Sequence, residues 1–469
     1  MSNLPVQNQQ KATGLRTGCL SFIEVLGQSI ANIAPTATPA ITIPVVFASA
    51  GSGTWIAYVF ATLAIVFLSF QINVFAKRSA TPGALYTYIT QGLGSGGGFV
   101  SGSALILAYL VTGSAVLCGF ANYANNLLSY IGIQISPVIL ILIGTIAAYL
   151  LTYKGVEISA RVMLIFEAIS VSLIFTLGII VLASHHFNFG TEQFTLKGIS
   201  TDNIRLGLVM AFFSFVGFES ATTMGKEAKK PLRNIPKAVT ISGIFVGLFF
   251  VLMSLIMVMG FAGSKVPLGE STSPLTYLAQ QAHVGIFGFL IDIGATVSFW
   301  SCTIACITAA ARVMLTMSGQ GFLPKSVAKC HTVNNTPYIA TAICAIIVGG
   351  IPVILQLAKN SNMDVYNWTG TLSVYGFLAN YLLIAVAAPI YLKKLKELKP
   401  LNIVTALISI VFVCIPIIGS VYPLPSFSIL VLQFIFLGWL AISLGYYLIV
   451  KHRKLSKKES FFSQEELAQ

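Results

Sequence analysis

Long apolar runs alternate with short polar connections along almost the whole chain. Twelve such runs can be delimited. Each is long enough for one helix to cross a bilayer, which takes about 20 residues. They cover residues 21–47, 54–75, 98–130, 136–153, 158–184, 205–225, 238–262, 286–316, 338–357, 367–392, 401–421 and 427–450. Runs 98–130 and 286–316 exceed one perpendicular crossing, so we expect these helices to tilt or protrude. The pattern predicts an all-α integral membrane protein with twelve transmembrane helices.

The composition supports this prediction. Of the 469 residues, 56% are hydrophobic and 9% are charged, whereas soluble domains contain about 25% charged residues. The net charge of +13 does not indicate nucleic-acid binding, because the basic residues form short clusters between apolar runs and no basic recognition helix is present. A water-soluble protein is therefore excluded, and no nucleic acid is expected as a partner.

The basic clusters also predict the orientation. If both termini are cytoplasmic, 23 of the 27 lysines and arginines lie on that side of the membrane. The other four are Lys197, Arg205, Lys265 and Lys359. Because cytoplasmic loops of membrane proteins carry the excess of positive charge, this split predicts a multi-pass protein of the cell (plasma) membrane with both termini inside. The basic start of the tail, at Lys451, is expected to attract anionic lipids of the inner leaflet.

Two of the apolar runs are interrupted. The first contains Pro35 and Pro39, which remove backbone donors and clash with the preceding turn. The sixth contains Gly217 beside the intramembrane carboxylate of Glu219. The two runs stand five apart, and broken helices at corresponding positions of two inverted halves indicate a transporter substrate site. The alternative is a pair of kinked helices that bind nothing.

The chain lacks other recognisable chemistry. Its seven cysteines contain no CxxC pair and are expected to be small buried residues. There is no nucleotide-binding GxxxxGK[ST] motif, no TVGYG filter and no clustered nucleophile, base or metal set. The sequence therefore predicts a protein that is not an enzyme and that needs no cofactor or metal.

Several stretches resemble the amino acid–polyamine–organocation family of permeases. They are FSFVGFES at 213–220, KEAKKPLRNIPKA at 226–238, PGALYTY at 82–88, KGVEISAR at 154–161 and ARVMLTMSGQGFLP at 311–324. The last departs from the family at Gly319-Gln320, where Arg-Asp is usual. The resemblance implies five-plus-five inverted repeats with broken helices 1 and 6, two added C-terminal helices, and alternating access around a midplane site.

This organisation divides the chain into five parts. We expect a cytoplasmic N-terminus at 1–20, a first repeat of helices 1–5 at 21–184, a second repeat of helices 6–10 at 205–392, helices 11–12 at 401–450, and a cytoplasmic tail at 451–469.

The ends of broken helices offer unpaired backbone groups to a substrate. The residues that we predict to contact it are Ile33, Ala34, Thr36 and Ala37 at the first break, Phe215, Val216, Gly217, Phe218 and Glu219 at the second, and Trp300 as an aromatic wall. At the first break Ala34-Pro35-Thr36 replaces the glycine-rich stretch that much of the family uses to hold a carboxylate, so polyamines and decarboxylated amines stay open beside amino acids.

The coupling ion is predicted from the fifth run. Glu167 lies about 15 Å into that helix, where a carboxyl group is a functional candidate by default. Some proton-coupled members of the family carry a lysine at the position of Ser170; this chain lacks that lysine, and Glu167 lies about one turn away. We therefore expect Glu167 and Ser170 to serve proton coupling. A sodium site built from Ser170 with Ser298 or Ser301 is the alternative, and so is a packing role for Glu167.

Together these features predict a secondary active transporter of amino acids or related amines, with proton-coupled uptake. An amino-acid or polyamine exchanger (antiporter) is the alternative within this class, and an ion channel is the alternative outside it. The expected partners are the small-molecule substrate, a proton or sodium ion, and membrane lipids; the chain acts as a monomer or a homodimer.

Overall fold

The computed structural model describes residues 14–466 except 191, 197 and 423–426. The long helices are α2 (Phe22–Ile33), α3 (Ile43–Ala50), α4 (Thr54–Ala76), α5 (Ala84–Ser129), α6 (Pro137–Lys154), α7 (Val156–Ser184), α9 (Thr201–Phe213), α10 (Pro231–Gly260), α11 (Pro274–Gln281), α12 (Gly285–Gly319), α13 (Tyr338–Leu357), α14 (Asn362–Lys394), α15 (Pro400–Val421) and α16 (Phe427–Glu466). Short helical segments complete the described chain: the π-helix η1 (Thr38–Thr42), α8 (Glu192–Thr195) and the 3₁₀ segments η2 (Gly51–Gly53), η3 (Phe218–Met224), η4 (Leu268–Glu270) and η5 (Lys325–Ala328).

Eleven helical stretches of the described residues are long and apolar enough to cross a membrane. The first of them, Phe22–Ala76, is 55 residues long and contains the first two predicted runs, which are joined by a continuous series of helical turns. The prediction of an all-α integral membrane protein is confirmed. The count of twelve crossings and the five-plus-five repeat stay predictions.

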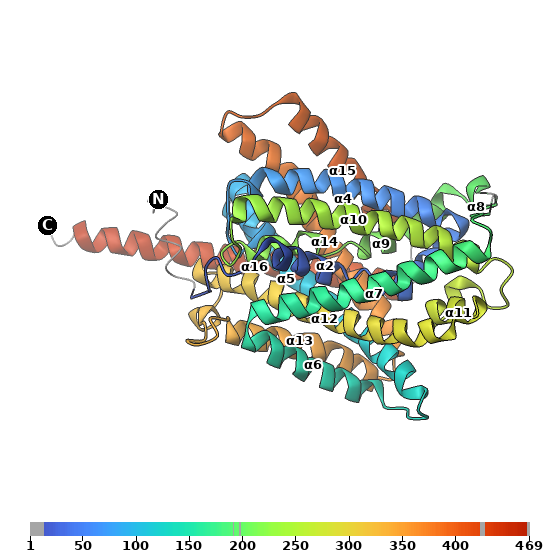
Figure 1. Cartoon of the computed structure of the whole chain (residues 1–469). Helices are drawn as coiled ribbons and strands as arrows, with labels where there is room; N and C mark the ends of the chain where they lie inside the picture. Colours follow the sequence, from blue (N-terminus) through green and yellow to red (C-terminus); the bar gives the residue numbers. More distant parts are fainter. Residues whose placement is uncertain (1–13, 191, 197, 423–426, 467–469) are drawn as a thin grey trace.

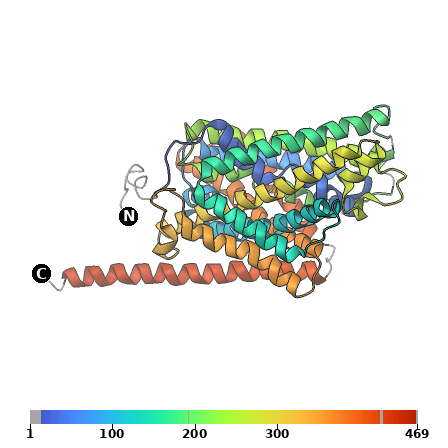
Figure 2. The same cartoon turned by 60° about the horizontal axis from the view of Figure 1, so that its bottom comes forward.

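The helices form one bundle around α5, which packs against both α12 and α14 (Figure 1). Two pairs flank this centre: α4 packs against α10, and α6 packs against α13. Figure 2 shows α16 running along the outside of the bundle and continuing beyond it. The two longest runs fall in α5 and α12, which span 46 and 35 residues, and their tilt or protrusion stays a prediction. Helix α5 bends at Gly94, whose φ of 82° is not helical.

Contacts between distant segments bring the basic connections to one end of the bundle. Asn73, near the end of α4, donates a hydrogen bond to Thr240, near the start of α10, over 2.8 Å. This antiparallel pairing places the end of α4, before Lys77 and Arg78, at the same end of the bundle as the start of α10. At the same end Tyr446 of α16 donates to the Phe322 carbonyl over 2.9 Å, just after α12. The side of the membrane that this end faces stays a prediction.

Candidate functional site

The first predicted break is present. Helix α2 ends at Ile33, and Ala34 takes a left-handed conformation with φ 50° as its C-cap. Its N–H donates to the Ile30 carbonyl over 3.0 Å, which closes the last turn. The chain then turns through Pro35 and re-enters a helix at η1, a π-helical segment that begins with Thr38 and Pro39. Proline suits the first turn of a helix, where its missing N–H is not needed, so the two prolines end one helix and start the next.

The second predicted break is present as well. Helix α9 ends at Phe213, and the chain passes through turns to Gly217, whose φ of 86° lies in the left-handed region that favours glycine. From Phe218 the chain continues as η3, a 3₁₀ helix of seven residues. The glycine that the sequence places beside Glu219 therefore supplies the conformation at which the two halves of this helix separate.

The two broken helices lie side by side and antiparallel, because α2 packs on η3 while α3 packs on α9. Ser29 of α2 donates a hydrogen bond to the Phe218 carbonyl over 2.8 Å and accepts one from the Ala221 N–H over 3.1 Å. At the crossing, a Cβ on Gly217 would lie 2.5 Å from Nδ2 of Asn32. The two breaks therefore meet at the same point inside the bundle.

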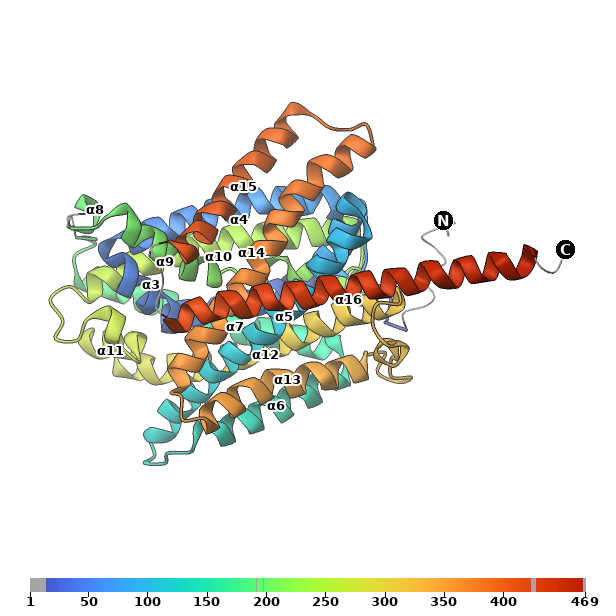
Figure 3. The same ribbon diagram turned by 180° about the vertical axis from the view of Figure 1, so that it is seen from behind.

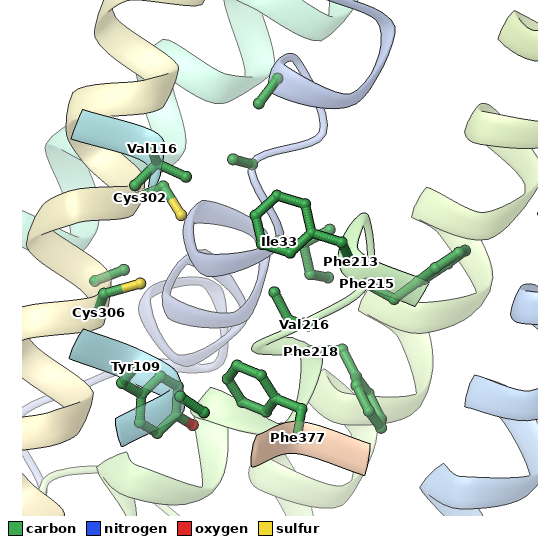
Figure 4. Close-up of a cluster of buried hydrophobic side chains, with 14 of the residues drawn as sticks. Ile33, Tyr109, Val116, Phe213, Phe215, Val216, Phe218, Cys302, Cys306 and Phe377 are labelled. Atoms are coloured by element: carbon green, nitrogen blue, oxygen red, sulfur yellow. The ribbon is translucent and has the colours of Figure 1, made fainter. Parts of the chain in front are cut away.

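A buried cavity of about 10 Å³ lies between the breaks, with room for about one water molecule. Its lining residues are Asn32, Ile33, Ala34, Ala37, Thr38, Thr42, Thr112, Val116, Phe213, Ser214, Val216, Cys302 and Tyr366. Figure 4 shows the apolar part of this wall, with Ile33, Phe213 and Val216 facing one another and Val116 and Cys302 opposite. The lining carries no Asp, Glu, Lys, Arg or His. Ligand pockets usually exceed about 300 Å³, so the cavity in this structure is smaller than a small-molecule site.

The structure brings part of the predicted contact set to this cavity. Ile33, Ala34, Ala37 and Val216 line it. Phe215 instead packs edge-on against Phe250 of α10, with ring centroids 5.2 Å apart, and points away from the first break (Figure 4). Substrate contact by any of these residues stays a prediction.

Three other predicted residues do not line the cavity. Phe218 packs on Tyr381 of α14, with ring centroids 5.5 Å apart, and Gly217 touches Asn32. Trp300 donates from Nε1 to the Gly144 carbonyl over 3.0 Å, so its indole faces α6, and substrate contact by Trp300 stays a prediction.

Sequence reasoning missed Asn32 and the residues that other helices contribute. Asn32 is buried, and its Nδ2 has no hydrogen-bond partner in the described chain. Its carbonyl and its Oδ1 accept weak hydrogen bonds from Cys302 and Cys306 over 3.2 and 3.0 Å. The sequence did offer a signal for Asn32, because a polar amide stands directly before the first break. Tyr366 in α14 offered none, because its position opposite Thr42, 3.2 Å away, depends on packing between distant segments.

Glu167 connects three elements next to the first break. It is fully buried in α7, where Thr36 donates a hydrogen bond to Oε2 over 3.1 Å and Ser298 of α12 donates to Oε1. No salt bridge to Glu167 occurs among the described residues. The predicted candidate Thr36 therefore faces the carboxyl group rather than the cavity. Ser170 donates to the Phe166 carbonyl over 2.8 Å and packs on Gly294.

Glu219 is also fully buried, but it does not line the cavity. Tyr109 of α5 donates to its Oε1 over 2.7 Å, and Tyr381 of α14 donates to its Oε2 over 2.9 Å. The carboxyl group thus joins η3 to two neighbouring helices. Both oxygens are occupied, which favours a clamp over direct amine recognition; the predicted role in substrate binding stays untested.

Local pairing explains two further acidic residues of the apolar runs, Glu24 and Asp292. Glu24 accepts a hydrogen bond from the Ser21 N–H over 2.7 Å and one from Arg161 over 2.6 Å, so it caps the start of α2. Asp292 accepts from Thr276 over 3.0 Å and from Tyr130 over 3.5 Å.

At the basic end of the bundle, hydrogen bonds join the segment before α2 to the segment after η3. The Leu20 N–H donates to the Glu227 carbonyl over 2.8 Å, and the Lys229 N–H donates to the Leu20 carbonyl over 2.7 Å. Arg312 of α12 holds Glu227 through two hydrogen bonds of 2.8 and 2.9 Å, and both side chains are 2% exposed. Burial lowers the pKa of the neighbouring Lys226. The segment before α2 and the segment after η3 therefore close this side together.

Two discontinuous membrane helices cross at a buried cavity, and this arrangement is typical of membrane transporters. Residues 24–459 match the model of the amino acid permease family, so the chain belongs to that family. The resemblance to the amino acid–polyamine–organocation permeases is thereby confirmed, and so are the predictions of a transporter that is not an enzyme.

Curated relatives agree with this assignment. The branched-chain amino acid permease BcaP of Bacillus subtilis is 27% identical over 87% of this chain and 88% of its own length. The methylthioribose transporter of the same species is 25% identical over 98% of both chains. The cationic amino acid transporter 4 of Mus musculus is 22% identical over 81% of this chain and 61% of its own length.

Proposed function

We propose that the protein is a secondary active transporter that takes up neutral amino acids with apolar side chains by alternating access. It lies in the plasma membrane with both termini in the cytoplasm, and protons that bind to Glu167 drive uptake. The observation that carries the proposal is the cavity at the crossing of the two breaks, because it is buried, mixed in polarity and free of charged side chains.

The lining supports a neutral substrate. Ile33, Val116 and Val216 give the cavity an apolar wall, on which an aliphatic side chain gains burial energy. A polyamine or a lysine side chain would bring an ammonium group into this space without a carboxylate to meet it, which is costly in a membrane interior. The relative named for branched-chain amino acids is consistent with this selection.

The polar part of the lining supports recognition of the amino-acid backbone. The last carbonyls of α2, up to Ile33, lie at the negative end of the helix dipole and favour an ammonium group. The Nδ2 of Asn32 offers an unused donor that suits a carboxylate. This donor takes the place of the bare amides that Pro35 cannot provide.

Proton coupling is supported by the position of Glu167. Its hydrogen bonds join the first break to α12, so loading or releasing a proton changes the contacts of a break that lines the cavity. A carboxyl group held by two hydroxyl groups, with no cation paired to it, exchanges a proton at a lower cost than one locked in a salt bridge. Glu167 is thus the coupling residue, and Thr36 transmits its state to the first break.

Uptake by purified protein in proteoliposomes tests this function. The panel contains leucine, isoleucine, valine, lysine, putrescine and methylthioribose, with an inward proton gradient, no sodium and no internal substrate. We expect accumulation of the branched-chain amino acids that a protonophore abolishes. Transport only into preloaded vesicles would replace symport by exchange, and dependence on sodium would replace the proton.

The same assay can contradict the proposed substrate separately from the proposed coupling. Transport of lysine or putrescine in preference to leucine would overturn the assignment of a neutral substrate. Methylthioribose is the second candidate substrate, because the methylthioribose transporter aligns with 98% of this chain and an uncharged cavity also accommodates an uncharged sugar. Uptake of methylthioribose without uptake of amino acids would overturn the amino-acid assignment while leaving alternating access in place.

A further inference from the structure

A surface cavity of about 800 Å³ lies at the basic end of the bundle, between the end of α4 and the hairpin that joins α14 to α15. Figures 1 and 3 show this hairpin standing away from the other helices, with α15 leaning outward. The lining residues are Phe70, Asn73, Val74, Lys77, Arg78, Leu392, Lys396, Glu397, Lys399 and Asn402. The cavity is remote from the two breaks and shares no lining residue with the site between them.

The charge of this cavity is strongly positive. Lys77, Arg78, Lys396 and Lys399 face a single carboxylate, Glu397. Arg78 pairs with Glu397 over 2.5 Å and also donates to the Val74 carbonyl. In the described chain no ion pair engages the three lysines, Lys77, Lys396 and Lys399. The cavity therefore holds more cationic donors than its own carboxylate can use, which suits a phosphate group.

The cavity also has an apolar approach. On α4, Phe70 is 44% exposed and lies about two turns before Lys77. On α15, Ile403 is 44% exposed directly after the basic loop, and Leu407 and Val411 continue the same exposed surface. Both helices belong to stretches long and apolar enough to cross a membrane. The charged cavity thus lies where two exposed apolar helix surfaces end.

We infer that this cavity binds the headgroup of an anionic glycerophospholipid. The phosphate lies among Lys77, Arg78, Lys396 and Lys399, while the acyl chains follow the exposed apolar surfaces of α4 and α15. A soluble phosphate would use the same cations but not the apolar approach, and this difference favours the lipid. The bound lipid joins α4 to the α14–α15 hairpin. This inference does not depend on the proposed substrate or on proton coupling.

The test uses the full-length protein in nanodiscs of phosphatidylcholine with or without phosphatidylglycerol. Retained lipid is counted by native mass spectrometry after release into detergent, and the thermal midpoint is measured in both nanodiscs. The pocket variant carries Lys77→Gln, Arg78→Gln, Lys396→Gln and Lys399→Gln. Its matched control carries Arg233→Gln, Lys237→Gln, Lys325→Gln and Lys329→Gln, which are equally exposed basic residues outside the cavity.

We expect the wild type and the control to retain phosphatidylglycerol and to melt at a higher temperature with it. Each pocket charge near the surface contributes about fivefold to retention, so the pocket variant should lose nearly all selective retention. Glu397→Gln should strengthen retention, which keeps the test decisive if the fourfold variant does not fold. Equal retention by the pocket variant and the control would overturn the inference. So would displacement of the lipid by millimolar inorganic phosphate, which would indicate a soluble-anion site.

Discussion

Gly217 and Asn32 touch across the crossing of the two broken helices, so closely that a Cβ on Gly217 would lie 2.5 Å from the Asn32 Nδ2. Gly217 also has a φ of 86°, which only glycine adopts at low cost. Gly217 thus sets the separation between α9 and η3, and it also sets how closely this broken helix approaches α2. The cavity depends on this single backbone approach.

Gly217→Ala should therefore damage the site. The left-handed conformation costs a side chain about 1–2 kcal/mol, and the new methyl group also displaces the Asn32 amide. We expect a lower thermal midpoint and a fall of at least about tenfold in the uptake rate, measured on purified protein in proteoliposomes. Gly350→Ala is the control, because a Cβ there has no neighbour within 4 Å. Normal uptake by Gly217→Ala would show that the close approach is not required.

Asn32→Ala removes the unused amide donor of the cavity. A hydrogen bond to a charged group contributes about 1.5–3 kcal/mol, so KM for leucine should rise at least about tenfold while the amount of folded protein stays constant. Asn122→Ala is the matched control, because its Nδ2 is also buried without a partner but lies outside the cavity lining. Equal KM values for the two variants would remove Asn32 from substrate recognition.

Glu167→Gln should separate transport from the proton gradient. The amide keeps the shape of the side chain and bonds to Thr36 and Ser298, but it cannot release a proton. A gradient of one pH unit is worth about 1.4 kcal/mol, or about tenfold accumulation for one proton per substrate. We expect the variant to equilibrate leucine without concentrating it and to keep exchange between preloaded vesicles and the medium.

The control for this variant is Glu270→Gln, an exposed carboxylate outside the predicted site. It should accumulate leucine as the wild type does. Retention of proton-driven accumulation by Glu167→Gln would return Glu167 to a packing role.

The Arg312–Glu227 pair should stabilise the closed basic end. Both side chains are 2% exposed, and removing one partner of such a pair leaves an uncompensated buried charge that costs about 3–5 kcal/mol. We expect Glu227→Gln to lower the thermal midpoint strongly. Adding Arg312→Met should recover part of the loss, because the unpaired charge is then gone. Strictly additive losses in the double variant would show that the two residues act independently.

Much of the fold follows from local sequence. Apolar runs of membrane-crossing length, Pro35 and Pro39 in the first run, and Gly217 in the sixth predict helices and breaks, because length, missing donors and left-handed φ act within a few residues. The structure has helices or breaks at each of these places. The excess of positive charge in alternate connections can likewise be predicted from the residues of each connection alone.

The interior of the site follows only from tertiary packing. Thr36, Glu167 and Ser298 are each 131 residues from the next along the chain, and they meet because α2, α7 and α12 pack together. The same packing turns Trp300 toward α6 and surrounds Glu219 with two tyrosines. The sequence determined that two helices break inside a membrane protein. Which side chains face the cavity was decided by the packing angles of distant helices, which no local pattern encodes.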